Sequence, residues 1–133
     1  MSIDLPEAGT VCMLTTYGPD GSLHTRPVKV WPGNCPYDLL VLTEYDAAKL
    51  TDIAHDPQVG LGAQSAEGWW SAEGTATVDP DATADTLRAA GLSSRLPVTV
   101  VRITLSRVRQ WVVTGTGPWD NSYAEQTFPA EAP

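Results

Sequence analysis

The order of apolar and polar positions predicts a chain made mostly of β-strands. Alternating or continuous apolar runs, divided by Gly, Pro, Asn and Asp, are typical of strands joined by turns. The predicted strands span residues 11–17, 23–31, 37–43, 59–65, 69–78 and 98–111. Two short helices are predicted at 46–55, with Asp46 as the N-cap, and at 80–90. Six antiparallel strands with so little helix favour a mainly β fold, a β-barrel with short helices.

The alternation within residues 69–78 separates two faces of one predicted strand. Trp70 and Val78 fall on the apolar face, which we expect to point into the barrel. Trp69 and Ser71 fall on the polar face. An indole on that face needs cover from a partner subunit, from the C-terminal segment or from a flat ligand.

The last part of the chain differs from the rest in composition. Gly, Pro, Ser and Glu dominate from Thr114 on. We therefore expect one domain, residues 1–113, and a C-terminal tail, residues 114–133, that lies outside the core. The tail still carries Trp119, Tyr123 and Phe128, which a fully disordered segment usually lacks. We predict that Trp119 docks on a partner subunit or near a ligand, while residues after Phe128 stay mobile.

The charge balance excludes some classes of partner. The 133 residues include 16 acidic and 8 basic side chains, which gives a formal net charge of −8. Such an acidic chain is not expected to bind nucleic acid or an anionic membrane surface. The N-terminus does not resemble a signal peptide, and no apolar run approaches the length of a membrane span. With only two cysteines, the sequence is typical of a cytoplasmic protein with reduced thiols.

Basic residues are rare in the first part of the chain, and their positions suggest a site. The first 87 residues contain only Arg26, Lys29 and Lys49. Lys49 lies at the start of a predicted helix, where a lysine is locally unfavourable unless it binds an anion together with the free amide groups. The arrangement predicts an anion site, and phosphate is the obvious candidate. Strict alternation turns Lys29 away from Arg26 unless a bulge at Pro27 changes the register.

Short motifs also follow one another in a specific order. They are Val-Cys-Met-Leu-Thr-Thr at 11–16, Asp-Gly at 20–21, His-Thr-Arg-Pro-Val at 24–28, Leu-Leu-Val-Leu-Thr at 39–43, Lys-Leu-Thr-Asp-Ile at 49–53, Asp-Pro-Gln-Val-Gly-Leu at 56–61 and Gly-Thr-Ala-Thr-Val at 74–78. This series resembles the FMN-binding split β-barrel superfamily of the pyridoxamine 5′-phosphate oxidase type. Within it, the small general-stress-protein-like flavoproteins are the most similar group.

The resemblance implies a six-stranded antiparallel split barrel of Greek-key type, with FMN bound at the interface of a homodimer. It implies that Arg26 and Lys49 hold the cofactor phosphate. The other cofactor-binding candidates are Pro27, Val28, Lys29, Thr43, Trp69 and Ser71. It further implies a flavin-dependent oxidoreductase with an unknown small-molecule substrate, and the sequence identifies no catalytic acid or base.

Several alternatives remain open. Relatives of this barrel use a deazaflavin or haem in place of FMN, and a binding or structural dimer without cofactor would keep only the barrel. The segment 79–97 is short, and no C-terminal element for pyridoxamine phosphate is recognisable, so vitamin B6 synthesis is not expected. His24 and His55 lack the spacing of metal ligands, and no metal site is predicted.

Overall fold

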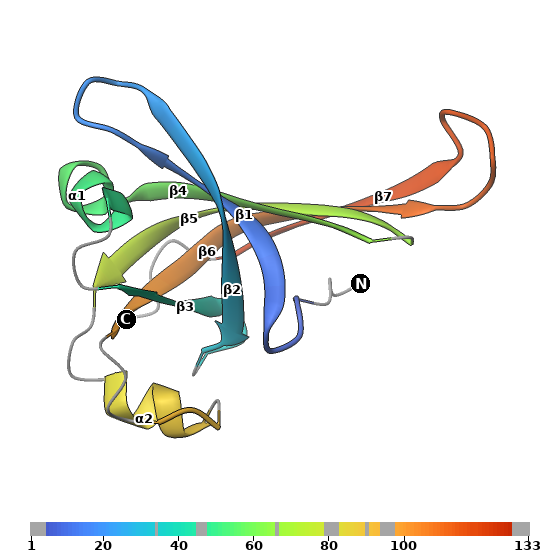
Figure 1. Ribbon diagram of the computed structural model, residues 1–133. Coiled ribbons are helices and arrows are strands. Elements are labelled where there is room, and N and C mark those ends of the chain that lie inside the picture. Colours follow the sequence, from blue (N-terminus) through green and yellow to red (C-terminus); the bar gives the residue numbers. More distant parts are fainter. Residues whose placement is uncertain are drawn as a thin grey trace.

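The computed structural model describes residues 5–33, 35–44, 48–65, 67–78, 83–89, 91–93 and 98–128. These residues form seven strands and two short helices (Figure 1). In chain order they are β1 Thr10–Tyr17, β2 Leu23–Pro32, β3 Asp38–Glu44, α1 Ala48–His55, β4 Gln58–Ser65, β5 Gly68–Val78, α2 Thr83–Ala89, β6 Val98–Val113 and β7 Asn121–Thr127.

The strands form an antiparallel sheet that closes on itself. Their order is β3-β2-β1-β4-β5-β6-β7, and a further pairing of β3 with β6 joins the two sides into a six-stranded barrel. The predicted fold class is therefore confirmed, and β7 is added to it. Figure 1 shows the β1–β2 hairpin extending past the barrel on the side of α1. The ends of β4, β5 and β6 extend with β7 on the other side.

Alternate residues of the strands point inward and build the core. On β1 these are Cys12 and Leu14, and on β2 they are Val28 and Val30, all of them buried. Cys12 is thus a small core residue, and burial raises the pKa of its thiol to about 11. The period of two fixes which side chains of β1 and β2 remain outside, and these include the candidate Lys29.

Strand β5 follows the predicted alternation except at its end. Trp70 is buried, as expected, while Trp69 on the opposite face is 40% exposed. Val78 is a correction, since we expected it inside and it is 44% exposed. It is the last residue of β5, where the strand reaches the rim of the barrel. Gly68 begins the strand at a point where a Cβ atom would collide with the backbone of Trp111.

The segment that we expected to lie outside the core also needs correction. Strand β7 pairs with the second half of β6, from Arg107↔Thr127 to Val113↔Asn121. Ala124 and Phe128 pack against the core, and the ring of Phe128 lies 5.5 Å from that of Tyr37. The polar sequence of β7 does not show the apolar pattern of a strand. The segment becomes a strand because it pairs with the exposed edge of β6. The predicted mobile residues after Phe128 lie outside the described part.

Helix α1 packs against β1 and β5 at one end of the barrel. It carries Lys49 in its first turn, as predicted, and its Ile53 belongs to the core. The predicted N-cap, Asp46, lies outside the described residues. No helix in the described part of the chain is long and apolar enough to cross a membrane.

Candidate anion site beside helix α1

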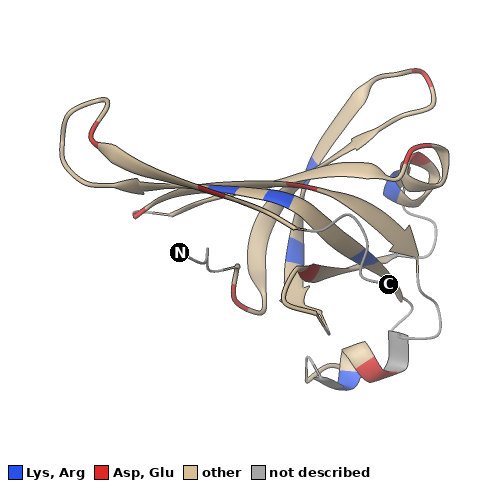
Figure 2. Cartoon of the chain, turned by 180° about the vertical axis from the view of Figure 1, so that it is seen from behind, with Lys and Arg blue, Asp and Glu red and all other residues tan. Residues whose placement is uncertain are grey.

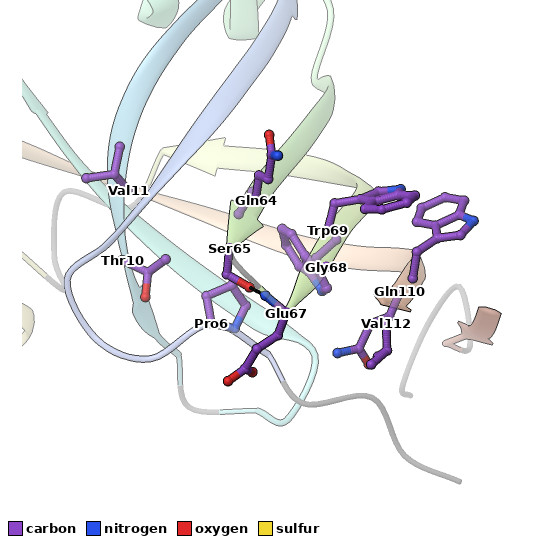
Figure 3. Close-up of a pocket in the computed structure, with 13 residues that line it drawn as sticks. Pro6, Thr10, Val11, Gln64, Ser65, Glu67, Gly68, Trp69, Gln110 and Val112 are labelled. Carbon is purple, nitrogen blue, oxygen red and sulfur yellow. Dashed lines mark hydrogen bonds between the residues drawn. The ribbon is translucent and has the colours of Figure 1, made fainter. Parts of the chain in front are cut away.

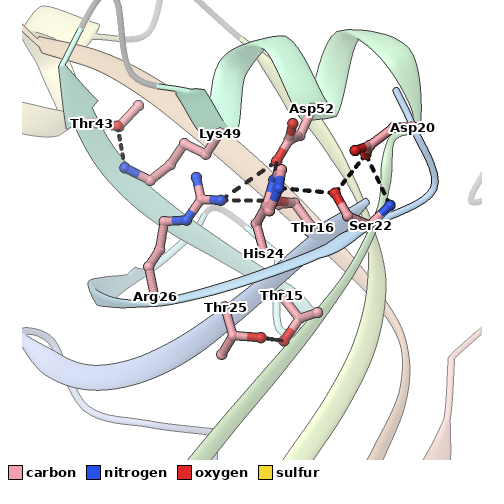
Figure 4. A network of polar contacts seen from close by, with 10 residues as sticks. All are labelled: Thr15, Thr16, Asp20, Ser22, His24, Thr25, Arg26, Thr43, Lys49 and Asp52. Carbon is pink, nitrogen blue, oxygen red and sulfur yellow. Dashed lines mark hydrogen bonds and ion pairs between the residues drawn. The ribbon is translucent and has the colours of Figure 1, made fainter. Parts of the chain in front are cut away.

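A buried carboxylate joins α1 to the β1–β2 hairpin. Asp52 is 3% exposed, and its Oδ2 accepts hydrogen bonds from Thr16 Oγ1 at 2.7 Å and from His24 Nδ1 at 2.6 Å (Figure 4). The Nη2 atom of Arg26 lies 3.5 Å from the same oxygen and 3.4 Å from Thr16 Oγ1. One turn of a short helix is therefore fixed to two strands by polar contacts.

The surroundings of Asp52 keep it ionised. The hydrogen bond from His24 contributes most to lowering the pKa of this carboxyl, with further contributions from the Thr16 hydroxyl and the positive charge of Arg26. Burial alone would raise the pKa, but these contacts outweigh it. A buried negative charge therefore lies within reach of the Arg26 guanidinium.

The turn between β1 and β2 continues this network. Ser22 Oγ donates to Asp20 Oδ1 at 2.5 Å and lies 3.1 Å from His24 Nε2. The hydrogen bond from Ser22 lowers the pKa of Asp20, so the Asp20 carboxylate only accepts. Because the single hydroxyl proton of Ser22 points to Asp20, the ring nitrogen of His24 faces an acceptor on this side too.

Lys49 reaches a buried hydroxyl on the neighbouring strand. Its Nζ donates to Thr43 Oγ1 at 2.7 Å, and Thr43 is 4% exposed. Lys49 and Asp52 are three residues apart on α1 and therefore share a face of the helix. Figure 4 shows both side chains beside this part of α1, with the Arg26 guanidinium directed to Asp52 and the Lys49 ammonium directed to Thr43. The structure thus brings together three of the predicted residues, namely Arg26, Thr43 and Lys49.

The other candidates on β2 do not join this group. The β1–β2 register runs without a shift, with Met13 opposite Pro27 and Val11 opposite Lys29. There is no bulge at Pro27, so Lys29 lies on the outer face and points away from Arg26. Pro27 lies in the part of β2 that β3 does not pair with, where the absence of an amide hydrogen is tolerated.

Trp69 and Ser71 lie on the outer face of β5. Arg26 belongs to the inward-facing residues of β2, so the two groups lie on opposite faces of the sheet. Within this chain the Trp69 indole is partly covered, because it stacks on Trp111 with ring centroids 5.7 Å apart. Trp111 in turn contacts Tyr123 of β7 at 5.0 Å. The C-terminal segment therefore shields part of the outer face on which the Trp69 indole lies. Trp119 is 88% exposed, and its predicted docking on a partner stays a prediction.

A pocket of about 230 Å³ lies beside Trp69, away from the anion site (Figure 3). The N-terminal segment, the start of β1, the β4–β5 hairpin and β6 line it. The pocket contacts Thr10 and Val11, whereas the anion site uses Thr16 at the other end of β1. At a rise of about 3.3 Å per residue, the two regions are about 20 Å apart along the strand. Trp70 lines the pocket, and its buried Nε1 has no hydrogen-bond partner among the described residues.

Sequence reasoning missed three residues of the site: Thr16, His24 and Asp52. A partial signal was present, since His24 and Arg26 alternate onto one face of β2, and Lys49 and Asp52 share one face of α1. Their meeting could not be foreseen, because the contacts join residues 26 to 36 positions apart.

Figure 2 places basic segments both on the strands and on the helices. In the described ranges, no three His, Cys, Asp or Glu side chains form a metal-binding group.

Comparison with known proteins identifies the family. The family model described as pyridoxamine 5′-phosphate oxidase matches residues 4–112. The chain belongs to the pyridoxamine 5′-phosphate oxidase family. The match covers the whole six-stranded barrel and ends one residue before the last residue of β6. The predicted resemblance is thereby confirmed.

Several solved structures share the fold of the chain at low sequence identity. General stress protein 26 from Bacillus anthracis is 19% identical, with a TM-score of 0.62 over 79% of this chain and 84% of that one. An F420 reductase is 13% identical, with a TM-score of 0.64 over 77% of this chain and 90% of that one. A heme binding protein from Mycobacterium smegmatis is 20% identical, with a TM-score of 0.65 over 90% of this chain and 53% of that one. No curated protein matches the chain.

Proposed function

We propose that the protein binds FMN as a homodimer and acts as a flavin-dependent oxidoreductase, with the cofactor phosphate held by Arg26, Thr43 and Lys49. One observation carries the proposal, namely that Arg26 and Lys49 both lie beside α1, where Lys49 donates to Thr43 and Arg26 contacts Asp52 one turn further along the helix. A guanidinium, an ammonium and a hydroxyl are the donors that a phosphate monoester requires. The match to the pyridoxamine 5′-phosphate oxidase family and the fold shared with an F420 reductase support a redox cofactor of the flavin type.

The donor set fits a phosphate in charge as well as in type. Arg26 and Lys49 carry two positive charges, and Asp52 contacts only Arg26 of the two. Only the Nη2 atom of Arg26 contacts Asp52 and Thr16, and within the described residues no hydrogen bond engages its Nε or Nη1. These atoms remain available for an anion. Asp52 therefore orients the guanidinium without occupying it fully.

Flavin selectivity tests the phosphate site directly. Two charge-assisted contacts, each contributing about 1.5–3 kcal/mol, imply that FMN binds at least about a hundredfold more tightly than riboflavin. Titration of the protein with each flavin, followed by flavin fluorescence, measures the ratio. Equal affinities for FMN and riboflavin would rule out the proposed phosphate site.

Of the five remaining candidates, Val28 is buried in the core, and the other four fit the proposal only if two chains take part. Pro27, Lys29, Trp69 and Ser71 lie on the outer face of the barrel, whereas Arg26 lies on the inward-facing row. One bound flavin can contact both groups if its phosphate lies on one subunit and its ring system meets the outer face of a second. A two-fold dimer with two equivalent sites satisfies this requirement.

Substitution of Trp69 tests the dimer. We expect Trp69→Glu to weaken self-association and, with it, FMN binding. Leu92→Glu is the matched control, because it introduces the same charge at another exposed apolar residue. Sedimentation equilibrium measures association of both variants. A wild-type protein that is monomeric at micromolar concentration would contradict the proposed dimer.

The bound flavin would supply the redox chemistry, while the residues of the chain bind it, orient it and set the local charge. The substrate is a small molecule whose identity the site does not specify. A deazaflavin would use the same phosphate contacts, and a cofactorless dimer would leave them unused. Haem is disfavoured at His24, because both of its ring nitrogens already contact other side chains. The visible absorption spectrum of the purified protein distinguishes FMN, deazaflavin, haem and no cofactor.

A further inference from the structure

We infer that His24 takes up a proton when Arg26 and Lys49 bind an anion, so that it acts as a third, proton-dependent cation of this site. The inference rests on the anion site of the proposed function and adds a regulation to it. It starts from His24 itself, whose side chain is 42% exposed at the edge of the network.

Both nitrogens of the His24 ring face hydrogen-bond acceptors. His24 Nδ1 lies 2.6 Å from Asp52 Oδ2, and an ionised carboxylate can only accept. His24 Nε2 lies 3.1 Å from Ser22 Oγ, whose own proton is directed to Asp20. A neutral imidazole carries one N–H and satisfies only one of these contacts. The doubly protonated ring satisfies both.

His24 is close enough to the anion site for its charge to matter. His24 Nδ1 and Arg26 Nη2 contact the same oxygen of Asp52, at 2.6 and 3.5 Å. The two nitrogens therefore cannot be more than about 6 Å apart, a distance over which unit charges interact appreciably in a protein. An anion bound to Arg26 would therefore also attract a positive charge on His24.

The charge balance gives the direction of the coupling. A proton on His24 adds one positive charge close to Arg26, and a bound anion adds negative charge to the same region. Binding of an anion therefore favours the proton, and by linkage the proton favours the anion equally. The charged groups that face His24 in the described structure are Asp52 on α1, Asp20 in the turn and Arg26 on β2. Both carboxylates favour the charged ring, and Arg26 opposes it until an anion is bound.

Sulfate is the suitable probe for this coupling. A phosphate ester changes its own charge near pH 6, whereas sulfate remains a dianion from pH 6 to pH 8. The experiment measures the dissociation constant of sulfate at both pH values for the full chain, by NMR titration. The chain contains only two histidines, so the His55→Gln variant leaves His24 as the single imidazole signal. His55 ends α1 outside the contact network and is exposed.

We expect sulfate to bind about three- to thirtyfold more tightly at pH 6 than at pH 8, and the His24 imidazole signal to shift when sulfate is added. The His24→Gln variant should lose this pH dependence while it still binds sulfate. Equal sulfate affinity at the two pH values, or an unchanged pH dependence in His24→Gln, would overturn the inference.

FMN binding separates this inference from the proposed function. If FMN binds with the predicted preference over riboflavin but sulfate affinity does not change with pH, the coupling is absent and the flavin site stands. If sulfate binding depends on His24 but FMN does not bind, the coupling is correct and the flavin assignment fails. Absence of both sulfate and FMN binding would refute the two together.

Discussion

Reversal of the charge at Lys49 is the most informative single change in this protein. In Lys49→Glu, a carboxylate replaces the ammonium that contacts Thr43. The substitution should abolish FMN binding with little effect on the fold. These two effects come from different interactions, so their magnitudes can be worked out separately.

Loss of one charge-assisted contact costs about 1.5–3 kcal/mol of binding free energy. The new carboxylate adds repulsion of about 1–4 kcal/mol per unit charge at about 4 Å. Together these terms weaken FMN binding at least about a hundredfold. In the apo protein, loss of the hydrogen bond to Thr43 costs about 0.5–1.5 kcal/mol. A carboxylate near the start of a helix recovers about 0.3–1 kcal/mol, so the free energy of unfolding should change by less than about 1 kcal/mol.

The assay combines an FMN titration with urea unfolding of the apo protein. Arg88→Glu is the matched control, because it changes the formal net charge by the same amount at an exposed position on α2. The control should bind FMN as the wild type does. If Lys49→Glu also binds FMN with wild-type affinity, Lys49 is only a surface residue and the phosphate site is wrong. A large loss of apo stability would show that Lys49 supports the fold.

Three further predictions address the fold. Because the pKa of Asp52 is lowered below its usual 3.8, its contribution to stability is present above that pH and is lost as the pH falls through the folded value. Unfolding curves of Asp52→Asn should therefore lack this part of the acid-induced loss, and an unchanged acid profile would contradict the assignment. Cys35 is exposed and should react with a thiol reagent at pH 8, whereas Cys12, with a pKa of about 11, should react only on unfolding. A double-mutant cycle of Trp111→Ala and Tyr123→Ala should give a coupling of about 0.5–1.5 kcal/mol, and strict additivity would show that β7 does not pack as described.

The strands and the first helix could be predicted because their signals are local. The alternation on β5 places Trp69 outside and Trp70 inside from the sequence alone. Lys49 in the first turn of a helix was equally readable, since the helix begins where the apolar pattern changes period. The face of Lys29 depended on a possible bulge at Pro27, and only the strand register resolved that question.

The seventh strand and the contacts of Asp52 could not be predicted in the same way. Strand β7 has a polar sequence, and it forms because β6 continues past the end of β3 and offers a free edge. Asp52 reads as an ordinary polar position of a short helix. Its contacts depend on the positions of Thr16 and His24 in the closed barrel. A local sequence pattern cannot predict those positions.

Asp52 serves the fold and restrains the site, so its two effects should separate on substitution. In Asp52→Asn, the hydroxyl of Thr16 and the ring of His24 lose a buried charged acceptor, which costs about 1–3 kcal/mol of unfolding free energy. The same change removes the only negative charge in contact with Arg26 among the described residues. Sulfate should therefore bind more tightly at pH 8, approaching the affinity of the wild type at pH 6, although the protein is less stable. Weaker sulfate binding in a folded Asp52→Asn protein would mean that the orientation of Arg26 outweighs its charge. A stable variant with tighter binding would instead show that Asp52 contributes little to the fold.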